Sequence, residues 1–158
     1  NNAIAWHEKA VQLAAQCAVD RDRLHAITLH GLARCRLANG EFERAVADSR
    51  SAYEEWCHQD RGGWDAVRAD RDLGEALLCW GKSLFDAEPT KAGDILREAA
   101  ERLKTAQREM AAFESVVADL VTCEELCDFA ERLLASLSTS EVGEVEKSLF
   151  IHSDERVA

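Results

Sequence analysis

Residues 26–59 read AITLHGLARCRLANGEFERAVADSRSAYEEWCHQ, and this stretch decides the fold. Two segments rich in helix-forming residues flank one tight-turn pair, Asn39-Gly40. Apolar and small residues recur in both segments at the three- and four-residue spacing of one helical face. They are Leu29, Leu32, Ala33 and Leu37 in the first segment, and Phe42, Ala45, Val46, Ser49, Ala52 and Tyr53 in the second. Because Gly40 can adopt the positive φ that ends a helix, the stretch predicts an antiparallel helical hairpin.

The composition of the whole chain indicates an all-α protein. The 158 residues include eight glycines and one proline, Pro89, which suits the first turn of a helix. Ala, Leu, Glu and Arg, which are strong helix formers, dominate the sequence, and few runs have the β-branched and aromatic residues of strands. Hydrophobic residues make up 47% of the chain, enough for the core of a single domain.

The apolar spacing predicts further helices on both sides of this hairpin. They cover residues 3–20, 64–85, 90 to a break near 105–109, 107–121 and 123–137. The first of them would turn one apolar face inward, formed by Trp6, Ala10, Leu13, Ala14 and Cys17. The helices of the hairpin would run from about Leu24 to Ala38, with Asp22 as N-cap, and from Glu41 to His58.

Polar residues predict two boundaries in the second half of the chain. Thr122–Glu125 has the Thr-x-x-Glu pattern of a capping box, which places a helix start there. The run at 138–140, Ser-Thr-Ser, indicates a polar linker. The chain therefore divides into a repeat domain at 1–137 and a short C-terminal helix and tail at 138–158.

Small residues also recur at a longer, fixed spacing. Alanines seven residues apart occur as Ala3 and Ala10, Ala45 and Ala52, and Ala92 and Ala99. A spacing of seven returns to the same helical face after two turns, and small side chains there let neighbouring helices approach closely. The pattern favours a series of related hairpins over the alternative, a plain helical bundle with an accidental alanine repeat.

Residues 26–59 resemble one unit of the tetratricopeptide repeat family, whose units have 34 residues. Counted from Ala26, the positions typical of the family hold Leu32, Ala33, Gly40, Phe42, Ala45 and Ala52. The chain departs at Arg36, where the family has an aromatic residue, and at Cys57, where it has proline. A second, looser match contains Leu77, Trp80, Gly81, Leu84, Ala92, Leu96 and Ala99. The resemblance implies about three antiparallel hairpins stacked as a right-handed superhelix, a fragment of an α-solenoid.

The resemblance also implies a function. In this family the first helix of each hairpin lines a concave groove that binds a peptide or a partner helix. The corresponding residues here are Ile27, His30, Arg34, Leu37, Glu75, Leu78, Lys82 and Phe85. We therefore expect a non-enzymatic scaffold for protein–protein interaction, part of a larger protein or complex. The alternative is a homo-oligomerisation module in which a terminal helix, such as 3–20, stacks on another copy.

Charge and cysteine content restrict the partners and the compartment. The formal net charge is -11, from 30 acidic and 19 basic residues, which disfavours nucleic acids and anionic membranes as partners. No run reaches the roughly 18 apolar residues of a membrane helix, and the first residues lack the pattern of a signal peptide. The six cysteines fall mostly at apolar helical positions, which predicts buried, reduced thiols in a cytoplasmic protein. Because the chain begins with Asn1 and not with methionine, we expect a fragment or a processed form.

The sequence contains no pattern typical of catalysis or of a cofactor. There is no glycine-rich phosphate loop and no nucleophile elbow, so we expect no enzyme activity and no cofactor. Cys123 and Cys127 share a helical face but lack the short-loop spacing of zinc sites, so we expect no metal. We also expect Asp70 and Asp72 to be solvated. We expect the four tryptophans to lie in the core, and an exposed pair of Trp56 and Trp64, which flank the Gly62-Gly63 loop, would instead mark an interface. The four are Trp6, Trp56, Trp64 and Trp80.

Overall fold

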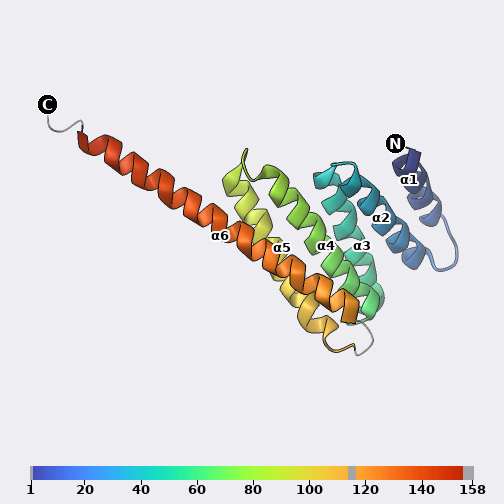
Figure 1. Ribbon diagram of the computed structural model, residues 1–158. Helices are drawn as coiled ribbons and strands as arrows, with labels where there is room; N and C mark the ends of the chain where they lie inside the picture. Colours follow the sequence, from blue (N-terminus) through green and yellow to red (C-terminus); the bar gives the residue numbers. More distant parts are fainter. Residues whose placement is uncertain (1, 114–116, 155–158) are drawn as a thin grey trace.

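The computed structural model describes residues 2–113 and 117–154, and the side-chain surroundings of residues 2–113, 119 and 121–139. The described residues form six α-helices and no strand, which confirms the all-α prediction. In chain order the helices are α1 (Asn2–Ala14), α2 (Arg21–Ala38), α3 (Phe42–Asp60), α4 (Trp64–Leu84), α5 (Pro89–Met110) and α6 (Val117–Asp154). Consecutive helices lie side by side in alternating directions, with α1 and α6 at opposite ends of the array (Figure 1).

The hairpin predicted from residues 26–59 forms as α2 and α3. Gly40 has a φ of 79°, a left-handed conformation that glycine adopts without strain. Its amide donates to the Leu37 carbonyl at 3.1 Å, and the Glu41 amide donates to the Arg36 carbonyl at 2.9 Å, so the last turn of α2 is closed. The residues buried in the hairpin are Ala26, Leu29, Leu32 and Ala33 on α2, and Ala45, Val46, Ser49 and Ala52 on α3.

Contacts between helices that are not consecutive define two layers. Besides packing against its neighbours in sequence, α4 contacts both α2 and α6, so α2, α4 and α6 form one layer. The other layer contains α1, α3 and α5. Within the described residues, no Cα atom of α3 lies within 8 Å of one in α5. The helices therefore approach one another more closely in the α2–α4–α6 layer.

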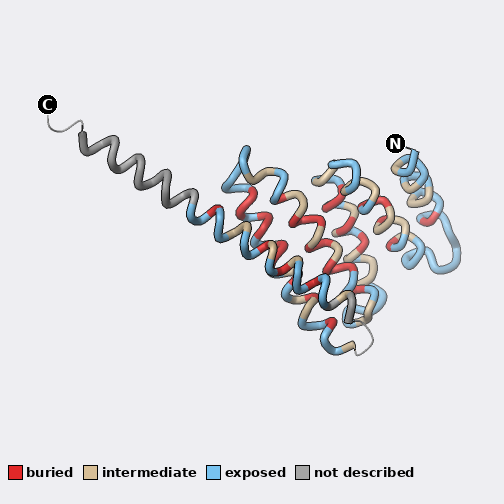
Figure 2. Tube along the Cα trace, in the orientation of Figure 1, coloured by how far each residue is buried: buried red, intermediate tan, exposed pale blue. Residues whose placement is uncertain are grey.

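The α4–α5 pair is held close because two glycines of α4 receive leucines of α5. A Cβ atom at Gly74 would lie 2.8 Å from Leu103 Cγ, and one at Gly81 would lie 2.7 Å from Leu96 Cγ. Both leucines are fully buried. The two glycines are seven residues apart in α4, and the two leucines are seven residues apart in α5, so the same two helical faces meet twice. These contacts lie in the main core, which Figure 2 shows as buried stripes along α4 and α5.

The first helix ends earlier than the apolar spacing predicts. α1 ends at Ala14, and residues 15–20, including the exposed Cys17, connect it to α2. The N-cap of α2 is Asp20, which has a φ of 51°, and Asp22 lies in the first turn. The prediction of Asp22 as N-cap is therefore wrong by two residues.

The predicted inward face of α1 is also wrong. Trp6 and Leu13 are 69% and 56% exposed, while Ala14 is buried. The helix instead presents His7 to α2, where a Cβ atom at Gly31 would lie 2.6 Å from His7 Cε1. Because the glycine leaves room for the imidazole ring, the rotation of α1 is set by this contact and not by its most apolar residues.

The break predicted near 105–109 is wrong because α5 continues to Met110. Leu103 and Met110 are both fully buried, so the apolar stripe runs past the predicted break. The chain then turns at Phe113, whose ring packs edge-on against Trp64 with 5.5 Å between the ring centroids. This contact fixes the turn after α5 against the start of α4.

A single helix, α6, replaces the predicted pair at 107–121 and 123–137. The capping pattern at Thr122–Glu125 lies inside α6 and does not start a helix. Cys123 and Cys127 are buried, and the apolar stripe of α6 continues through them against α5. The described residues therefore form two complete hairpins, α2–α3 and α4–α5, and the third hairpin does not form as predicted.

The linker predicted at 138–140 is helical as well, and two of its hydroxyl groups bond to carbonyls of the same helix. Ser138 Oγ donates to the Leu134 carbonyl at 3.1 Å, and Thr139 Oγ1 donates to the Ser136 carbonyl at 2.9 Å. Residues 155–158 of the predicted tail lie outside the described residues. Among the described helices, none combines the length and apolar character needed to cross a membrane.

Candidate functional site

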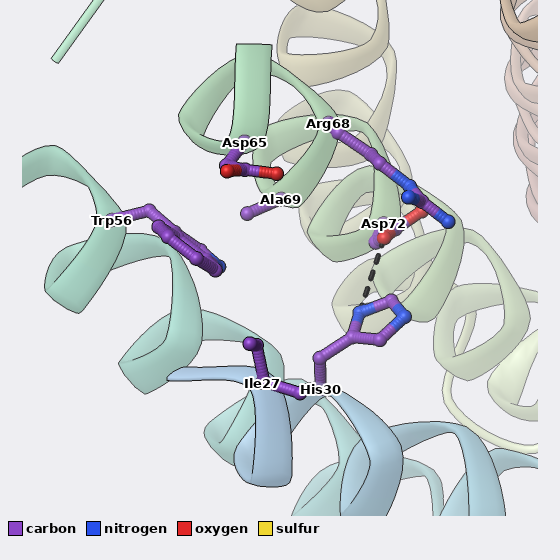
Figure 3. Close-up of a pocket in the computed structure, with 7 residues that line it drawn as sticks. All are labelled: Ile27, His30, Trp56, Asp65, Arg68, Ala69 and Asp72. Carbon is purple, nitrogen blue, oxygen red and sulfur yellow. Dashed lines mark ion pairs between the residues drawn. The ribbon is translucent and has the colours of Figure 1, made fainter. Parts of the chain in front are cut away.

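A cavity of about 160 Å³ opens between the first halves of α2 and α4. It is lined by Ile27, His30, Trp56, Asp65, Arg68, Ala69 and Asp72. Trp56 projects from α3 and faces Ala69 and Asp65 of α4 across the cavity (Figure 3). We call this cavity the Trp56 pocket. Its lining combines apolar side chains with acidic and basic ones.

A second hollow, of about 220 Å³, follows along the same two helices. It is lined by His30, Ala33, Arg34, Leu37, Ala38, Ser49, Asp72 and Glu75, and we call it the Arg34 pocket. The two pockets share His30 and Asp72. Together they form one depression along the α2–α4–α6 layer, named the α2–α4 groove below.

A buried ion-pair network fixes the floor of the groove. Arg71 of α4 is 7% exposed, and its Nη2 donates to Asp72 Oδ1 at 2.6 Å. Its Nη1 donates to Asp119, in the first turn of α6. Asp72 is therefore held in place by Arg71, and the same arginine joins α4 to α6 within the layer.

His30 and Asp72 meet where the two pockets join. His30 Nδ1 lies 3.2 Å from Asp72 Oδ2 (Figure 3), yet this buried oxygen has no hydrogen-bond partner among the described residues. Burial lowers the pKa of His30; the charge of Asp72 opposes this shift, and the charges of Arg68 and Arg34 add to it. The imidazole ring and the Asp72 carboxylate therefore form a close polar contact where the two pockets join.

The groove also contains two arginine side chains that have no acidic partner among the described residues. Among the described residues, Arg34 and Arg68 form no ion pair and no side-chain hydrogen bond, and both are exposed. The guanidinium of Arg68 points toward the end of the Trp56 pocket where His30 and Asp72 meet (Figure 3). Ile27, 48% exposed, presents apolar surface next to them. The groove can thus contact both apolar and anionic groups.

Five of the eight residues assigned to a groove from the family resemblance line these pockets: Ile27, His30, Arg34, Leu37 and Glu75. Leu78 does not, because it is only 2% exposed, and its assignment to the groove surface is wrong. Since α4 is surrounded by α2, α3, α5 and α6, its buried face is wide enough to enclose Leu78 as well as Leu77. Lys82 and the half-buried Phe85 lie farther along α4, where Lys82 Nζ is 5.4 Å from the ring centroid of Phe129 in α6.

The groove residues assigned from the family resemblance do not include Trp56, Arg68 and Asp72, although all three line the Trp56 pocket. Arg68 and Asp72 precede Glu75 by seven and three residues, which is the spacing of one helical face, so this pattern could have identified them. Trp56 comes from α3, and no pattern within α2 or α4 points to it. The expectation that Asp70 and Asp72 are solvated is wrong: Asp70 is 4% exposed, and the Asp72 side chain is 13% exposed.

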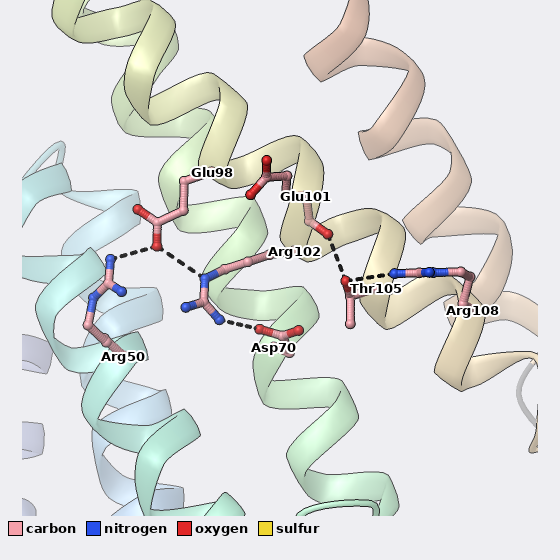
Figure 4. A network of polar contacts seen from close by, with 7 residues as sticks. All are labelled: Arg50, Asp70, Glu98, Glu101, Arg102, Thr105 and Arg108. Carbon is pink, nitrogen blue, oxygen red and sulfur yellow. Dashed lines mark hydrogen bonds and ion pairs between the residues drawn. The ribbon is translucent and has the colours of Figure 1, made fainter.

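Long polar side chains bridge α3 and α5 in the other layer (Figure 4). Glu98 of α5 accepts from Arg50 of α3 at 2.9 Å and from Arg102 at 3.2 Å. Arg102 also donates to the buried Asp70 at 2.5 Å, and its guanidinium carbon lies 5.2 Å from the centroid of the Tyr53 ring. Although burial raises the pKa of Asp70, Arg102 opposes the shift. These contacts connect the two helices whose backbones remain apart.

A second bridge explains the departure from the family pattern at Arg36. This arginine of α2 donates to Asp48 of α3 at 2.6 Å and to Glu8 of α1 at 2.8 Å. Its side chain is only 14% exposed. Where the resemblance implies an aromatic residue packed between helices, this chain has an ion-paired arginine that joins three helices.

The described residues contain no group of three or more His, Cys, Asp or Glu side chains that could hold a metal ion. All six cysteines lie in the described part of the chain, and each is a free thiol there. No model of a protein family matches the chain, and comparison with curated proteins and with solved structures gave no match. The candidate site therefore rests on the geometry of the α2–α4 groove.

Proposed function

We propose that this chain is a non-enzymatic interaction module that binds a peptide or partner protein in the α2–α4 groove. The observation that carries this proposal is the composition of the groove surface. It combines the exposed Ile27, the half-buried Trp56 and two arginines, Arg34 and Arg68, without a contacting counter-ion. Exposed apolar surface marks interaction sites, and aromatic residues and arginine are enriched at protein interfaces.

The arrangement of the helices supports a tetratricopeptide-like architecture for this module. Two hairpins follow each other, and their first helices, α2 and α4, touch while their second helices, α3 and α5, stay apart. Stacked hairpins with this unequal spacing curve toward the first helices and produce a concave binding surface. The right-handed superhelix belongs to the same proposal. So does a reducing, cytoplasmic location, which is supported by six free thiols in the described part of the chain.

The proposal is tested by comparing proteins retained from a native extract by three forms of the chain. The wild type is compared with a groove variant carrying Ile27→Glu and Arg34→Ala, and with Arg97→Gln as a control for loss of charge. Arg97 is an exposed arginine of α5, paired with Asp94 and outside both pockets. A set of proteins retained by the wild type and the control, but lost by the groove variant, supports the function. Identical sets for all three forms contradict it.

A second candidate function is self-association through α1. Its favouring observation is the exposure of Trp6 and Leu13, which are seven residues apart and share one helical face. A second copy stacked on this face would cover both side chains. Light scattering over a series of concentrations tests this candidate, with Trp6→Glu plus Leu13→Glu as the matched variant. A wild type that remains monomeric at every concentration removes it.

A further inference from the structure

We infer that the α2–α4 groove selects an extended peptide segment with one apolar and one acidic side chain, spaced about three residues apart. The apolar side chain enters the Trp56 pocket, and the acidic side chain pairs with Arg34. This inference rests on the proposed function and specifies its ligand. The proposed ligand is a peptide, and each of its features follows from a separate part of the groove.

The size and lining of the Trp56 pocket determine the apolar group. Its volume of about 160 Å³ is close to the roughly 150 Å³ of an apolar cavity that holds one benzene molecule. Ile27, Trp56 and Ala69 form its apolar wall. A phenyl or isobutyl group fits this space and packs against the apolar wall.

The charges along the groove determine the acidic group and its place. Arg34 lines one pocket with His30 and Arg68 lines the other with His30, and neither arginine forms an ion pair among the described residues. Asp65 lines one pocket and Glu75 lines the other. Asp72, which lines both pockets, is already paired with Arg71, so a ligand carboxylate between Asp65 and Glu75 meets the unpaired Arg34 and Arg68, but one beyond either acid meets like charge. The groove therefore favours one central acid over an acidic run.

The spacing follows from helix geometry. Arg34 is seven residues after Ile27 on α2, which corresponds to about 10 Å along the helix axis. An extended chain advances about 3.4 Å per residue, so three residues cover the same distance. A side chain seated beside Ile27 and a carboxylate at Arg34 therefore belong to residues i and i+3, in either chain direction.

The separation of the two anchoring places favours a peptide over a small anion. The Trp56 pocket and Arg34 lie along different parts of the groove. An extended peptide carries an apolar and an acidic side chain on one backbone and reaches both places, whereas a free phosphate reaches the arginine alone.

The test uses a phage-displayed library of random dodecapeptides, selected on the immobilised protein and counter-selected on the Ile27→Glu variant. Enriched peptides are then synthesised, and their affinities are measured by fluorescence anisotropy. We expect an aromatic or leucine residue and an Asp or Glu three positions apart. Replacing that acid by its amide should weaken binding about tenfold. Arg34→Gln should weaken the acidic peptide by a similar factor and leave the amide peptide unchanged, while Arg97→Gln should change neither.

The outcomes separate this inference from the function on which it rests. If peptides depend on Ile27 but lack an acid, or bind equally to the Arg34→Gln variant, the ligand assignment is overturned and the binding function stands. If no peptide prefers the wild type over Ile27→Glu, both are overturned. Because Ile27 and Arg34 are exposed, their substitution should leave the melting temperature near that of the wild type, which is checked in parallel.

Discussion

Replacing Gly81 by alanine tests whether the close approach of α4 and α5 depends on the absence of a side chain. The new Cβ atom would lie 2.7 Å from Leu96 Cγ, 2.8 Å from Leu96 Cδ2 and 3.4 Å from the Ala92 carbonyl oxygen. Carbon atoms in contact are normally about 3.5 to 4.0 Å apart. Leu96 is fully buried, so its branched end cannot move into solvent. The helices must separate or the leucine must leave its preferred rotamer.

Two effects of opposite sign set the size of the change. Alanine favours a helix interior over glycine by about 1 kcal/mol. Overpacking of a close-packed core costs roughly 1 to 3 kcal/mol. Because two leucine atoms are affected at once, we expect the overpacking to win, and the difference between the two effects lowers the free energy of unfolding of Gly81→Ala by up to about 2 kcal/mol. For a chain of this size, each kcal/mol corresponds to a loss of about 2 to 4 °C in melting temperature.

The matched control is Gly93→Ala in α5. Its new Cβ atom would meet Arg97 Nη2 at 3.5 Å and Leu137 Cδ1 at 3.7 Å, which are ordinary contacts. Only the gain in helix propensity remains, so this variant should be stabilised by about 0.5 to 1 kcal/mol. The two glycine substitutions are thus expected to have opposite signs. Urea unfolding followed by circular dichroism, with thermal melting as a second measurement, gives both values.

A double-mutant cycle assigns the cost to the contact with Leu96. In a Leu96→Ala background the obstructing atoms are absent, so adding Gly81→Ala should no longer destabilise the protein. The reasoning is refuted if Gly81→Ala stabilises the protein as Gly93→Ala does. It is also refuted if the cost of Gly81→Ala is the same with and without the Leu96 side chain.

Three further predictions concern the ion pairs and titrating groups. Arg36→Met should lower the free energy of unfolding by about 3 kcal/mol, because the Asp48 side chain, which is 12% exposed, loses its partner, and it should increase hydrogen exchange in α1. As a control, Arg44→Met replaces an arginine side chain that is 72% exposed and should change the free energy of unfolding by less than about 0.5 kcal/mol. Burial lowers the pKa of His30, so the folded state binds fewer protons, and the stability of wild type relative to His30→Gln should fall on acidification from about pH 7.5 to 5.5. Burial alone would raise the pKa of Glu98, but the hydrogen bonds that it accepts from two arginines lower this pKa below its usual value. The stability of the wild type relative to Glu98→Gln should therefore decline as the pH falls below about 4.3. A stability difference that stays constant with pH would contradict this prediction.

Local signals in the sequence predict most of the helices. The apolar spacing and Gly40 locate α2, α3 and the turn between them within a few residues, because both depend on neighbouring residues only. The start of α5 follows in the same way from Pro89. The break within 105–109 is mispredicted, because helix length alone cannot show where the buried stripe of α5 ends.

Side-chain roles that depend on which helices become neighbours were not predictable in this way. His7 and not Trp6 packs against α2, where Gly31 has no side chain to obstruct the imidazole ring. The capping pattern at Thr122–Glu125 lies within α6, because burial of the stripe through Cys123 against α5 favours a continuous helix. At Thr122–Glu125, tertiary packing thus outweighs a capping preference worth about 1 kcal/mol.

The features of the candidate groove also come partly from local sequence and partly from tertiary packing. The sequence by itself determined that Ile27, His30 and Arg34 share one face of a helix, because the helical period is a property of the local backbone. Only the tertiary structure decided that Trp56 of α3 closes a pocket beside them and that Asp72 of α4 meets His30. Those contacts join residues more than twenty positions apart, and their distances depend on how closely α2, α3 and α4 pack. Helix spacing is set by the buried side chains between the helices, and no local pattern encodes it.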